Sequence, residues 1–247
     1  MQLWSFEGLM EYGAIRQLQL ELVELRHLEL IPDTVLALEH QPVITQGRGL
    51  QFTGAARPRH MPLPSLPQGV AFSETERGGD LTYHGPGQWV IYPIFKLDGN
   101  GWAPHRDVEG FLRQLESVCV ALLAHYGVRA ETRSHATGVW IGDRKVASIG
   151  IAIRKWVSFH GLALNCVNDL KPFYAFSPCG FAPEVMTRLA DCAPLGENWR
   201  AHLEQVCIQL FNQKLTQSGG KPIECFSFRS LSEAQARLDL IRSRAAL

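Results

Sequence analysis

The sequence RGGDLTYHGPGQWVIYPI, residues 77–94, is rich in glycine and proline and carries a Thr, a Tyr and a His close together. Only its last part, QWVIYPI, has the pattern of a strand, and the part before it has neither the apolar period of a helix nor a clean alternation. The stretch lacks the spacing of the common phosphate-binding glycine motifs, and no strong helix pattern follows it directly. Because glycine lets a backbone approach a ligand closely, these residues predict a loop that lines a substrate site.

Outward from this loop, short strands alternate with amphipathic helices. Strands are predicted at 35–40, 42–49, 89–97, 156–167 and 223–228, and residues 137–154 predict a hairpin about a Gly-Asp turn at 142–143. Helices are predicted over 9–30, 107–126 and 199–213, and a last helix is predicted to begin at Ser232, with Gln235 completing a capping box. Residues 53–71 predict a loop or mobile lid, and 171–198 are irregular. This order predicts an α+β fold, a mixed or antiparallel β-sheet with α-helices packed against it.

The composition is that of a globular protein of one domain, residues 1–247. The chain has 24 basic and 24 acidic residues and no run of like charges, which argues against nucleic acid as a partner. No apolar run reaches the roughly 18 residues that a membrane span needs. The start, MQLWSFEGLMEYG, lacks the basic segment of a signal peptide. We therefore expect a cytoplasmic protein, or an organellar one if a presequence has been removed.

The six cysteines show no CxxC pair and no spacing typical of a zinc site, so no metal site is predicted. Cys119, Cys166 and Cys207 fall within apolar helix or strand patterns and are predicted to be core thiols.

Cys179 stands in a different setting, FSPCGFAP. Pro178 fixes the preceding turn and Gly180 removes bulk after it, so the thiol can project from a tight corner as a nucleophile. The N–H groups that follow can face a developing oxyanion. Cys192, in ADCAPLG, is a rival of the same kind, and either could equally be a thiol in a simple turn.

A cysteine nucleophile needs a partner that deprotonates it or stabilises its thiolate. The candidates are His84, His160 and Lys145. Lys145 follows the predicted hairpin turn and precedes the apolar or small residues VASIG, so it is either held against an apolar wall or solvated in the turn. His160, in SFHGLALN, is either a partner or a hydrogen-bonded histidine of the sheet.

Taken together, these segments resemble one family, the lipoyl(octanoyl) transferases, or octanoyl-[acyl-carrier-protein]–protein N-octanoyltransferases. The matching stretches are LEHQPVITQGR (38–48), RGGDLTYHGPGQWVIYPI (77–94), TGVWIGDRKVASIGIAI (137–153), SFHGLALN (158–165) and SPCGF (177–181). They follow the family's order and spacing, including the 34 positions from Lys145 to Cys179. The resemblance covers about residues 1–215.

The resemblance implies the fold of the biotin/lipoate protein ligase catalytic domain and the activity of an acyltransferase. Cys179 would take the octanoyl group from octanoyl-acyl carrier protein as a thioester. The ε-amine of a lysine on a lipoyl domain would then receive it, in 2-oxoacid dehydrogenase complexes or the glycine-cleavage H protein. Lys145 would be the second catalytic residue, lowering the pKa of Cys179. No cofactor and no metal are implied, and we expect a monomer.

The family's acyl tunnel implies a set of substrate-binding residues in three segments. They are Arg77, Gly78, Gly79, Asp80, Leu81, Thr82, Tyr83, His84, Ser148, Ile149, Gly150, Gly161, Leu162 and Ala163. Gly78, Gly79, Gly161 and Ala163 are small where such a tunnel needs room.

Some of the chain has no counterpart among the family's motifs. These parts are the loop 53–71, residues 72–76 and the tail 216–247, which is predicted to hold a strand and a helix. Three other functions use the same features: a cysteine-dependent hydrolase or amidase, an ATP-dependent lipoate ligase, and an acyl-binding module without catalysis.

Overall fold

The computed structural model describes residues 1–49, 66–99, 102–134, 136–176, 183–217 and 221–245. Its main sheet has eight strands. In spatial order they are β11 (Glu224–Phe228), β1 (Gln2–Met10), β2 (Thr34–His40), β6 (Gln88–Ile94), β10 (Val157–Asn165), β9 (Arg144–Arg154), β8 (Ala136–Ile141) and β7 (Glu131–Arg133). β1 is parallel to both of its neighbours and all other pairs are antiparallel, so the predicted mixed sheet is confirmed.

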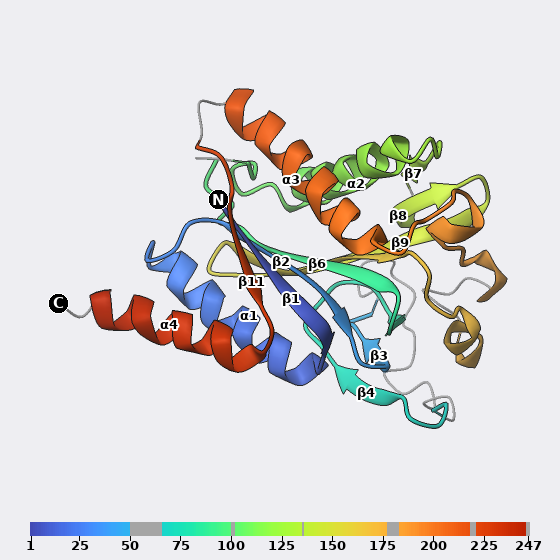
Figure 1. The fold of residues 1–247 in the computed structure, drawn as a ribbon, viewed down its shortest axis with the longest axis horizontal. Coiled ribbons are helices and arrows are strands. Elements are labelled where there is room, and N and C mark those ends of the chain that lie inside the picture. The colour runs from blue at the N-terminus through green and yellow to red at the C-terminus, as the bar shows by residue number, and fades with distance from the viewer. Residues whose placement is uncertain (50–65, 100–101, 135, 177–182, 218–220, 246–247) are drawn as a thin grey trace.

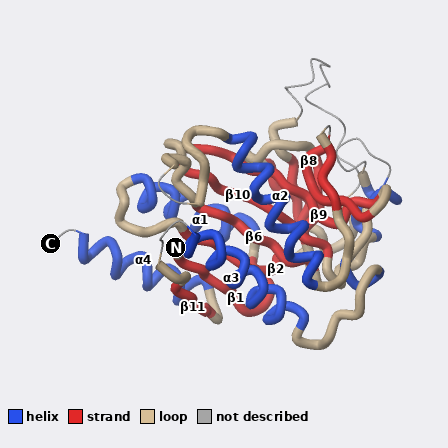
Figure 2. The backbone as a smooth tube through the Cα atoms, turned by 90° about the horizontal axis from the view of Figure 1, so that it is seen from above, coloured by secondary structure: helices blue, strands red, loops and turns tan. Residues whose placement is uncertain are grey.

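Helices cover both faces of this sheet. They are α1 (Tyr12–His27), α2 (Val108–His125), α3 (Trp199–Gln217) and α4 (Leu231–Ala245). Figure 1 shows α1 and α4 on one side of the sheet and α2 and α3 on the other, and Figure 2 shows α2 and α3 lying across its strands. Each face has its own apolar core, one built around Phe111 and Phe211 and the other around Trp4 and Leu22. The periodic apolar residues that predicted the helices are therefore the residues that cover the sheet.

A second sheet of three strands stands beside the first. Its order is β4 (Ala71–Glu74), β3 (Val43–Gln46) and β5 (Leu81–His84), with β3 parallel to β4 and antiparallel to β5. Its apolar side packs against the short 3₁₀ helix Lys171–Ala175 and against Met186. Two further 3₁₀ turns, Pro183–Val185 and Leu189–Asp191, lie in the segment predicted to be irregular.

The element boundaries differ from the sequence prediction in several places. Strands β1, β4, β5 and β7 were not predicted, and α1 begins at Tyr12, where the Glu11 carboxylate accepts from the N–H groups of Gly13 and Ala14. The capping box placed at Ser232 is wrong. α4 begins at Leu231, Ser230 Oγ accepts from Glu233 N at 3.4 Å, and the Glu233 carboxylate accepts from Arg229 N at 2.9 Å.

The predicted loop and the tail, both without family motifs, have different outcomes. Residues 53–65 of the predicted loop or lid lie outside the described residues, and 66–70 are a loop that leads into β4. In the tail, the predicted strand and helix are present as β11 and α4, and β11 joins the main sheet beside β1. The tail is therefore part of the main sheet and its helical cover.

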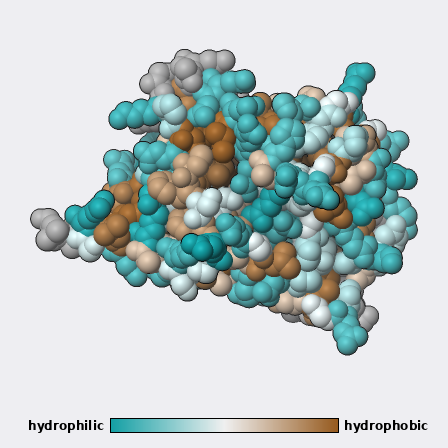
Figure 3. All heavy atoms as spheres, viewed as in Figure 1, coloured by the Kyte–Doolittle hydropathy of each residue, from teal (hydrophilic) through white to brown (hydrophobic). Residues whose placement is uncertain are grey.

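The surface is mixed in character. Hydrophilic residues cover most of the face in Figure 3, and apolar residues appear among them in separate patches. Among the described helices, none has the length and apolar content to cross a membrane.

Candidate active site

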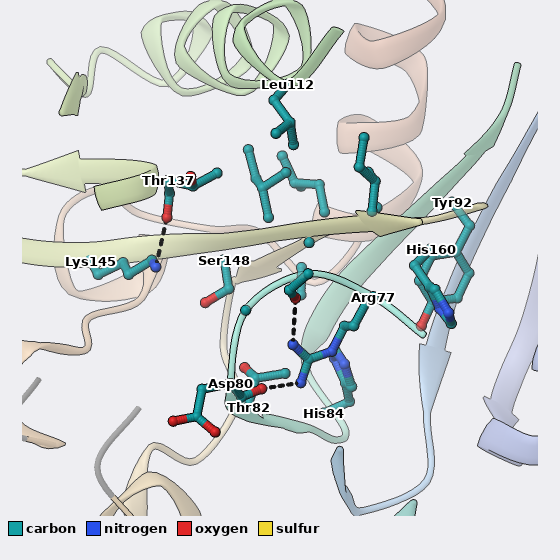
Figure 4. Close-up of a pocket in the computed structure, with 18 of the residues that line it drawn as sticks. Arg77, Asp80, Thr82, His84, Tyr92, Leu112, Thr137, Lys145, Ser148 and His160 are labelled. Carbon is teal, nitrogen blue, oxygen red and sulfur yellow. Dashed lines mark hydrogen bonds between the residues drawn. The ribbon is translucent and has the colours of Figure 1, made fainter. Parts of the chain in front are cut away.

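A cavity of about 460 Å³ lies where the two sheets meet. This volume falls in the range of small-molecule sites, roughly 300–1,000 Å³. Leu112 of α2, Ile149 and Ile151 of β9 and Leu162 of β10 give it an apolar side, and the loop 77–80 with β5 gives it a polar side (Figure 4). The remaining lining residues are Tyr12, Arg77, Gly78, Gly79, Asp80, Thr82, His84, Tyr92, Val108, Ala136, Thr137, Lys145, Ser148, Gly150, His160, Gly161 and Ala163.

The cavity collects twelve of the fourteen predicted substrate-binding residues, all except Leu81 and Tyr83. Successive side chains of a strand point to opposite faces, so in β5 Thr82 and His84 face the cavity while Leu81 and Tyr83 face away. These two pack instead with Ile44 and Phe173 in the apolar core of the small sheet. Their inclusion in the predicted cavity wall is wrong, because the prediction took the motif as a continuous loop.

The loop Arg77–Asp80 is held at the cavity by β9 and by the residues that follow β3. Gly78 N donates to Ile151 O of β9 at 2.9 Å, and Arg48 N and Gly49 N donate to Arg77 O and Gly79 O at 3.0 Å. A Cβ on Gly150 would lie 2.7 Å from Gly78 O, so the glycine in β9 is what admits this loop. Gly79 has φ +80°, a conformation that favours glycine.

Arg77 ties this loop together from inside. Its Nη2 donates to Thr45 O and Asp80 O, both at 2.7 Å, and its Nη1 donates to Gly78 O at 3.0 Å. Arg77 is 7% exposed, and three of the hydrogen bonds that its guanidinium donates go to backbone carbonyls. Arg77 lines the cavity as predicted and also fixes the shape of the loop around it.

Gly161 differs from the prediction in the reason for its small size. A Cβ there would lie 2.2 Å from Ile91 O and 2.6 Å from Pro93 Cδ, both on β6. The glycine makes room for the neighbouring strand and not for a ligand. Gly78, in contrast, has only Ile151 O near its Cβ position, at 3.7 Å, and leaves open space at the cavity.

Lys145 is buried at one end of the cavity, 5% exposed, so it is not a solvated turn lysine. Its Nζ donates to Thr137 O at 2.8 Å (Figure 4). The same atom lies 5.6 Å from the centre of the Trp140 ring. The segment that follows residue 182 lies beside Lys145. Met186 forms an isolated parallel β-bridge with Lys145, and Thr187 N donates to Lys145 O at 3.0 Å.

His84 begins a buried chain of hydrogen bonds. Gln88 Nε2 donates to Tyr83 O at 3.0 Å and to Asn165 Oδ1 at 2.9 Å, so Gln88 Oε1 is left to accept from His84 Nδ1 at 2.7 Å. Asn165 Nδ2 donates in turn to Thr187 O at 3.0 Å. Burial holds the pKa of His84 well below its usual 6.5, so the ring is neutral with its proton on Nδ1. His84 thus helps to fix residue 187, besides lining the wall.

Tyrosine and histidine side chains form the other end of the cavity. Tyr12 Oη lies 3.5 Å from His160 Nδ1, and His160 Nε2 lies 3.4 Å from Glu76 Oε2. Burial lowers the pKa of His160 to about 4 and raises that of Tyr12 to about 12, so both are neutral near pH 7. His160 and Tyr92 stand on the opposite side of Figure 4 from Lys145. Of the three candidate partners for a thiol, His84 and His160 are neutral, and the third is the amine of Lys145.

A comparison with known protein families matches residues 14–218 to the lipoyl protein ligase A/B catalytic domain. The chain belongs to the lipoyl protein ligase A/B family. Its similar relatives include the octanoyltransferase of Dictyoglomus turgidum, 36% identical over 93% of this chain and 92% of that protein. The octanoyltransferase of Thermosynechococcus vestitus is 40% identical over 76% of this chain and 80% of that protein. Both relatives are octanoyltransferases, and this member of the family is likewise an acyltransferase.

Solved structures of the ligase A/B family show the same fold. A lipoate-protein ligase A bound with ATP superposes with a TM-score of 0.63 at 15% identity, covering 98% of this chain and 95% of that one. A bi-partite lipoate protein ligase from Thermoplasma acidophilum, studied with its E2 lipoyl domain, gives a TM-score of 0.62 at 14% identity, covering 98% and 92%. The predicted biotin/lipoate ligase fold is therefore confirmed.

The cysteines of this ligase A/B family member fall into two groups. Cys119, Cys166 and Cys207 are buried as predicted, and burial raises the pKa of each thiol. Cys192 and Cys225 are exposed and do not line the cavity. Cys179 lies outside the described residues.

Several lining residues escaped prediction from the sequence. Val108 and Leu112 belong to the predicted helix but face the cavity, and Tyr12 comes from the start of α1. Their apolar or aromatic character is equally typical of a core, so no local signal separates them. Within the described part of the chain, no group of three His, Cys, Asp or Glu is placed to hold a metal ion.

Proposed function

We propose that this protein transfers an octanoyl group from octanoyl-acyl carrier protein to the ε-amine of a lysine on lipoyl domains, through a thioester on Cys179. The observation that carries the proposal is the buried amine of Lys145 at the end of an apolar-sided cavity, in a chain that is 36–40% identical to octanoyltransferases. The acceptors would be lipoyl domains of 2-oxoacid dehydrogenase complexes and the glycine-cleavage H protein. The enzyme would act as a cytoplasmic monomer.

The first half-reaction exchanges one thioester for another. The Cys179 thiolate attacks the carbonyl carbon of the donor, a new C–S bond forms and the bond to the carrier sulfur breaks. The leaving sulfur takes its proton from Lys145. The Lys145 ammonium favours the thiolate of Cys179 beforehand, since a nearby cation lowers the pKa of a thiol.

The second half-reaction forms the amide. The neutral amine of the acceptor lysine attacks the Cys179 thioester, a C–N bond forms, and the C–S bond breaks to return the thiolate. The proton lost from the amine is accepted by Lys145. Thioester to amide is downhill, so neither half-reaction needs ATP.

The cavity supplies selectivity for an alkyl chain. Each buried CH₂ contributes about 0.8 kcal/mol, and Leu112, Ile149 and Leu162 offer apolar surface for it. The roles of Cys179 and of the substrate-lining residues as binding groups are part of this proposal. The role proposed for Cys179 is supported by residues 186 and 187, which follow Cys179 closely in sequence and lie beside Lys145.

The test is mass spectrometry of the intact enzyme after incubation with octanoyl-carrier protein without ATP. We expect the wild type to gain one octanoyl group, which leaves when an unmodified lipoyl domain is added. Cys179→Ser should gain no thioester, and Lys145→Ala should lose most transfer while it keeps its fold by circular dichroism.

Two outcomes contradict the proposal. Octanoyl transfer by Cys179→Ser at near the wild-type rate would remove the thioester mechanism. An acyl-enzyme that decays in buffer at the same rate with or without the lipoyl domain would indicate a hydrolase instead.

A further inference from the structure

A buried carboxylate on α2 has no place in the chemistry above. Glu116 is 0% exposed, on the helix face that carries Leu115 and Cys119 into the apolar core. Removing a charged group from water costs free energy unless it is paired and hydrogen-bonded. The partners of Glu116 therefore indicate what this charge does.

Glu116 has two partners of different kinds. Its Oε2 accepts from Arg113 Nη1 at 2.8 Å, one turn earlier on the same helix. Its Oε1 accepts from the backbone N–H of Gly138 on β8 at 2.9 Å. The second bond is long-range and buried, and it joins α2 to the strand beside Lys145.

The N–H of Gly138 and the C=O of Thr137 belong to one peptide group. Lys145 Nζ donates to that C=O at 2.8 Å, while the Glu116 carboxylate accepts from that N–H (Figure 4 shows the lysine contact). A single peptide group thus lies between an anion and a cation. Hydrogen bonds in such a chain polarise one another, so the carboxylate makes the carbonyl oxygen a stronger acceptor for the ammonium.

The local backbone fits this arrangement closely. Gly138 has φ +130°, and a Cβ there would lie 2.5 Å from Lys145 Cε and 2.6 Å from Ala147 O. The pairing of β8 with β9 also shifts here: one step on β8, Val139 to Trp140, faces two steps on β9, Ala147 to Lys145. Irregularities of this kind re-aim a side chain, in this case that of Lys145.

We propose that Glu116 is a positioning residue for Lys145. Glu116 acts through the peptide group that joins Thr137 to Gly138, and it keeps Lys145 cationic and in place at the cavity. The proposal rests on the proposed function, in which Lys145 is the partner of Cys179. A buried ammonium is disfavoured by its loss of water, and the carboxylate behind the peptide offsets that loss.

Other groups near Lys145 set the background for a measurement against pH. Arg77 and Asp80 line the same cavity from the loop 77–80, and β8 presents the Trp140 ring, over which Arg133 lies at 4.3 Å. The segment after residue 182 presents Met186 and Thr187. Glu116→Gln changes none of these and keeps an oxygen that can accept from Gly138 N.

The experiment follows the alkylation of Cys179 by iodoacetamide against pH, read by mass spectrometry of the peptide that contains it. In Glu116→Gln we expect the midpoint to move up by about one pH unit, because a less stabilised ammonium favours the thiolate less. Below the midpoint, acylation by octanoyl-carrier protein should slow about tenfold, with little change in KM for the donor. Glu109→Gln is the matched control, since Glu109 is an exposed acid on α2 that also contacts Arg113, at 3.9 Å. It should leave the midpoint and rate unchanged.

A second measurement does not require Glu116 to be replaced. The amide proton resonance of Gly138 reports its hydrogen bond to the carboxylate, and Lys145→Met should move this resonance upfield although Lys145 does not touch that N–H.

The outcomes separate the two proposals. An unchanged Gly138 resonance in Lys145→Met overturns the inference, as does a Glu116→Gln variant with lower stability but the wild-type midpoint. A wild type that gains no octanoyl group contradicts the proposed function instead.

Discussion

His40 is a buried histidine with a shifted pKa, in the polar cluster near the cavity. Its Nδ1 donates to Met10 O at 3.0 Å, and its Nε2 lies 2.8 Å from Tyr92 Oη, which donates to it. This pattern requires the neutral ring, since a proton on Nε2 would displace the tyrosine's hydrogen bond. Burial lowers the pKa of His40 from 6.5 to about 4.

This shift makes stability fall as the pH is lowered through the weakly acidic range. Below about pH 6.5 the unfolded chain protonates His40, whereas the folded chain does so only below about 4. Between these values the unfolded state binds more protons, so the unfolding free energy decreases by about 2 kcal/mol per such histidine from pH 7 to pH 5. His160, with a pKa of about 4, adds to this in the wild type.

Urea unfolding at pH 7 and pH 5 checks the prediction. The wild type should lose stability over this interval, and His40→Gln, which cannot titrate, should lose about 2 kcal/mol less. Equal losses in the two proteins would contradict the assignment of the low pKa to His40. The comparison uses the difference between pH values, so a change in absolute stability of the variant does not affect it.

At the level of single residues, the sequence identified candidate site residues better than it predicted their hydrogen-bond partners. It left Lys145 open between an apolar wall and a solvated turn, the family resemblance selected this residue, and the structure places the lysine at the cavity. It could not assign the guanidinium of Arg77 to the carbonyls of Thr45 and Asp80, because the first of these is distant in sequence. Glu116 left one signal: it is a charge on the apolar face of a predicted helix, four residues after Leu112 and three before Cys119.

Among the elements, the loop Arg77–Asp80 depends on a glycine of another segment. Gly47 follows β3, and its N–H donates to Asp80 O at 3.2 Å. A Cβ on Gly47 would lie 2.3 Å from Gly79 O and 2.8 Å from Arg77 O, both backbone atoms. The loop therefore cannot keep its position beside a larger residue here.

We expect Gly47→Ala to displace this loop and to reduce octanoyl transfer, with a loss of about 1–3 kcal/mol in unfolding free energy. Gly196→Ala is the control, because its Cβ would meet nothing within 4 Å. That variant should keep full activity and unchanged or slightly higher stability. Transfer assays and urea unfolding of both proteins test the difference, and an active, stable Gly47→Ala would show that the loop tolerates the added methyl group.

Elements were predicted well where periodicity was long and poorly where strands were short or polar. The helices α1, α2 and α3 and the hairpin strands β8 and β9 were found because many apolar residues repeat in them. β5 was missed because it has only four residues, Leu81–His84, and glycine-rich sequence lies on both sides of it. β4 and β7 are short edge strands with little buried surface, which leaves almost no pattern to detect.

For the whole molecule, the helices that cover the main sheet contribute unequally to the cavity. The face under α2 and α3 reaches the cavity through Leu112, Ile149 and Leu162. On the other face α1 contributes Tyr12 to the cavity, and none of the residues that line it belongs to α4. β11 and α4 lie beyond the 14–218 match to the ligase A/B domain, yet β11 pairs with β1 over Gln2 to Phe6. This division predicts that the C-terminal helix stabilises the fold without taking part in the chemistry.

Two leucines on α4 separate these roles. Leu238 is 0% exposed in the core with Trp4 and Ala234, whereas Leu240 is 50% exposed. Leu238→Ala should lower the unfolding free energy by about 2–5 kcal/mol, because truncating a buried leucine loses apolar contact and leaves a cavity. Leu240→Ala should change it by less than about 0.5 kcal/mol. Below the unfolding transition both variants should acylate Cys179 at the wild-type rate per folded molecule, since no catalytic group moves. A Leu238→Ala protein that is fully folded but acylates slowly would mean that α4 influences the site through the sheet, and the predicted separation of α4 from the chemistry would then be wrong.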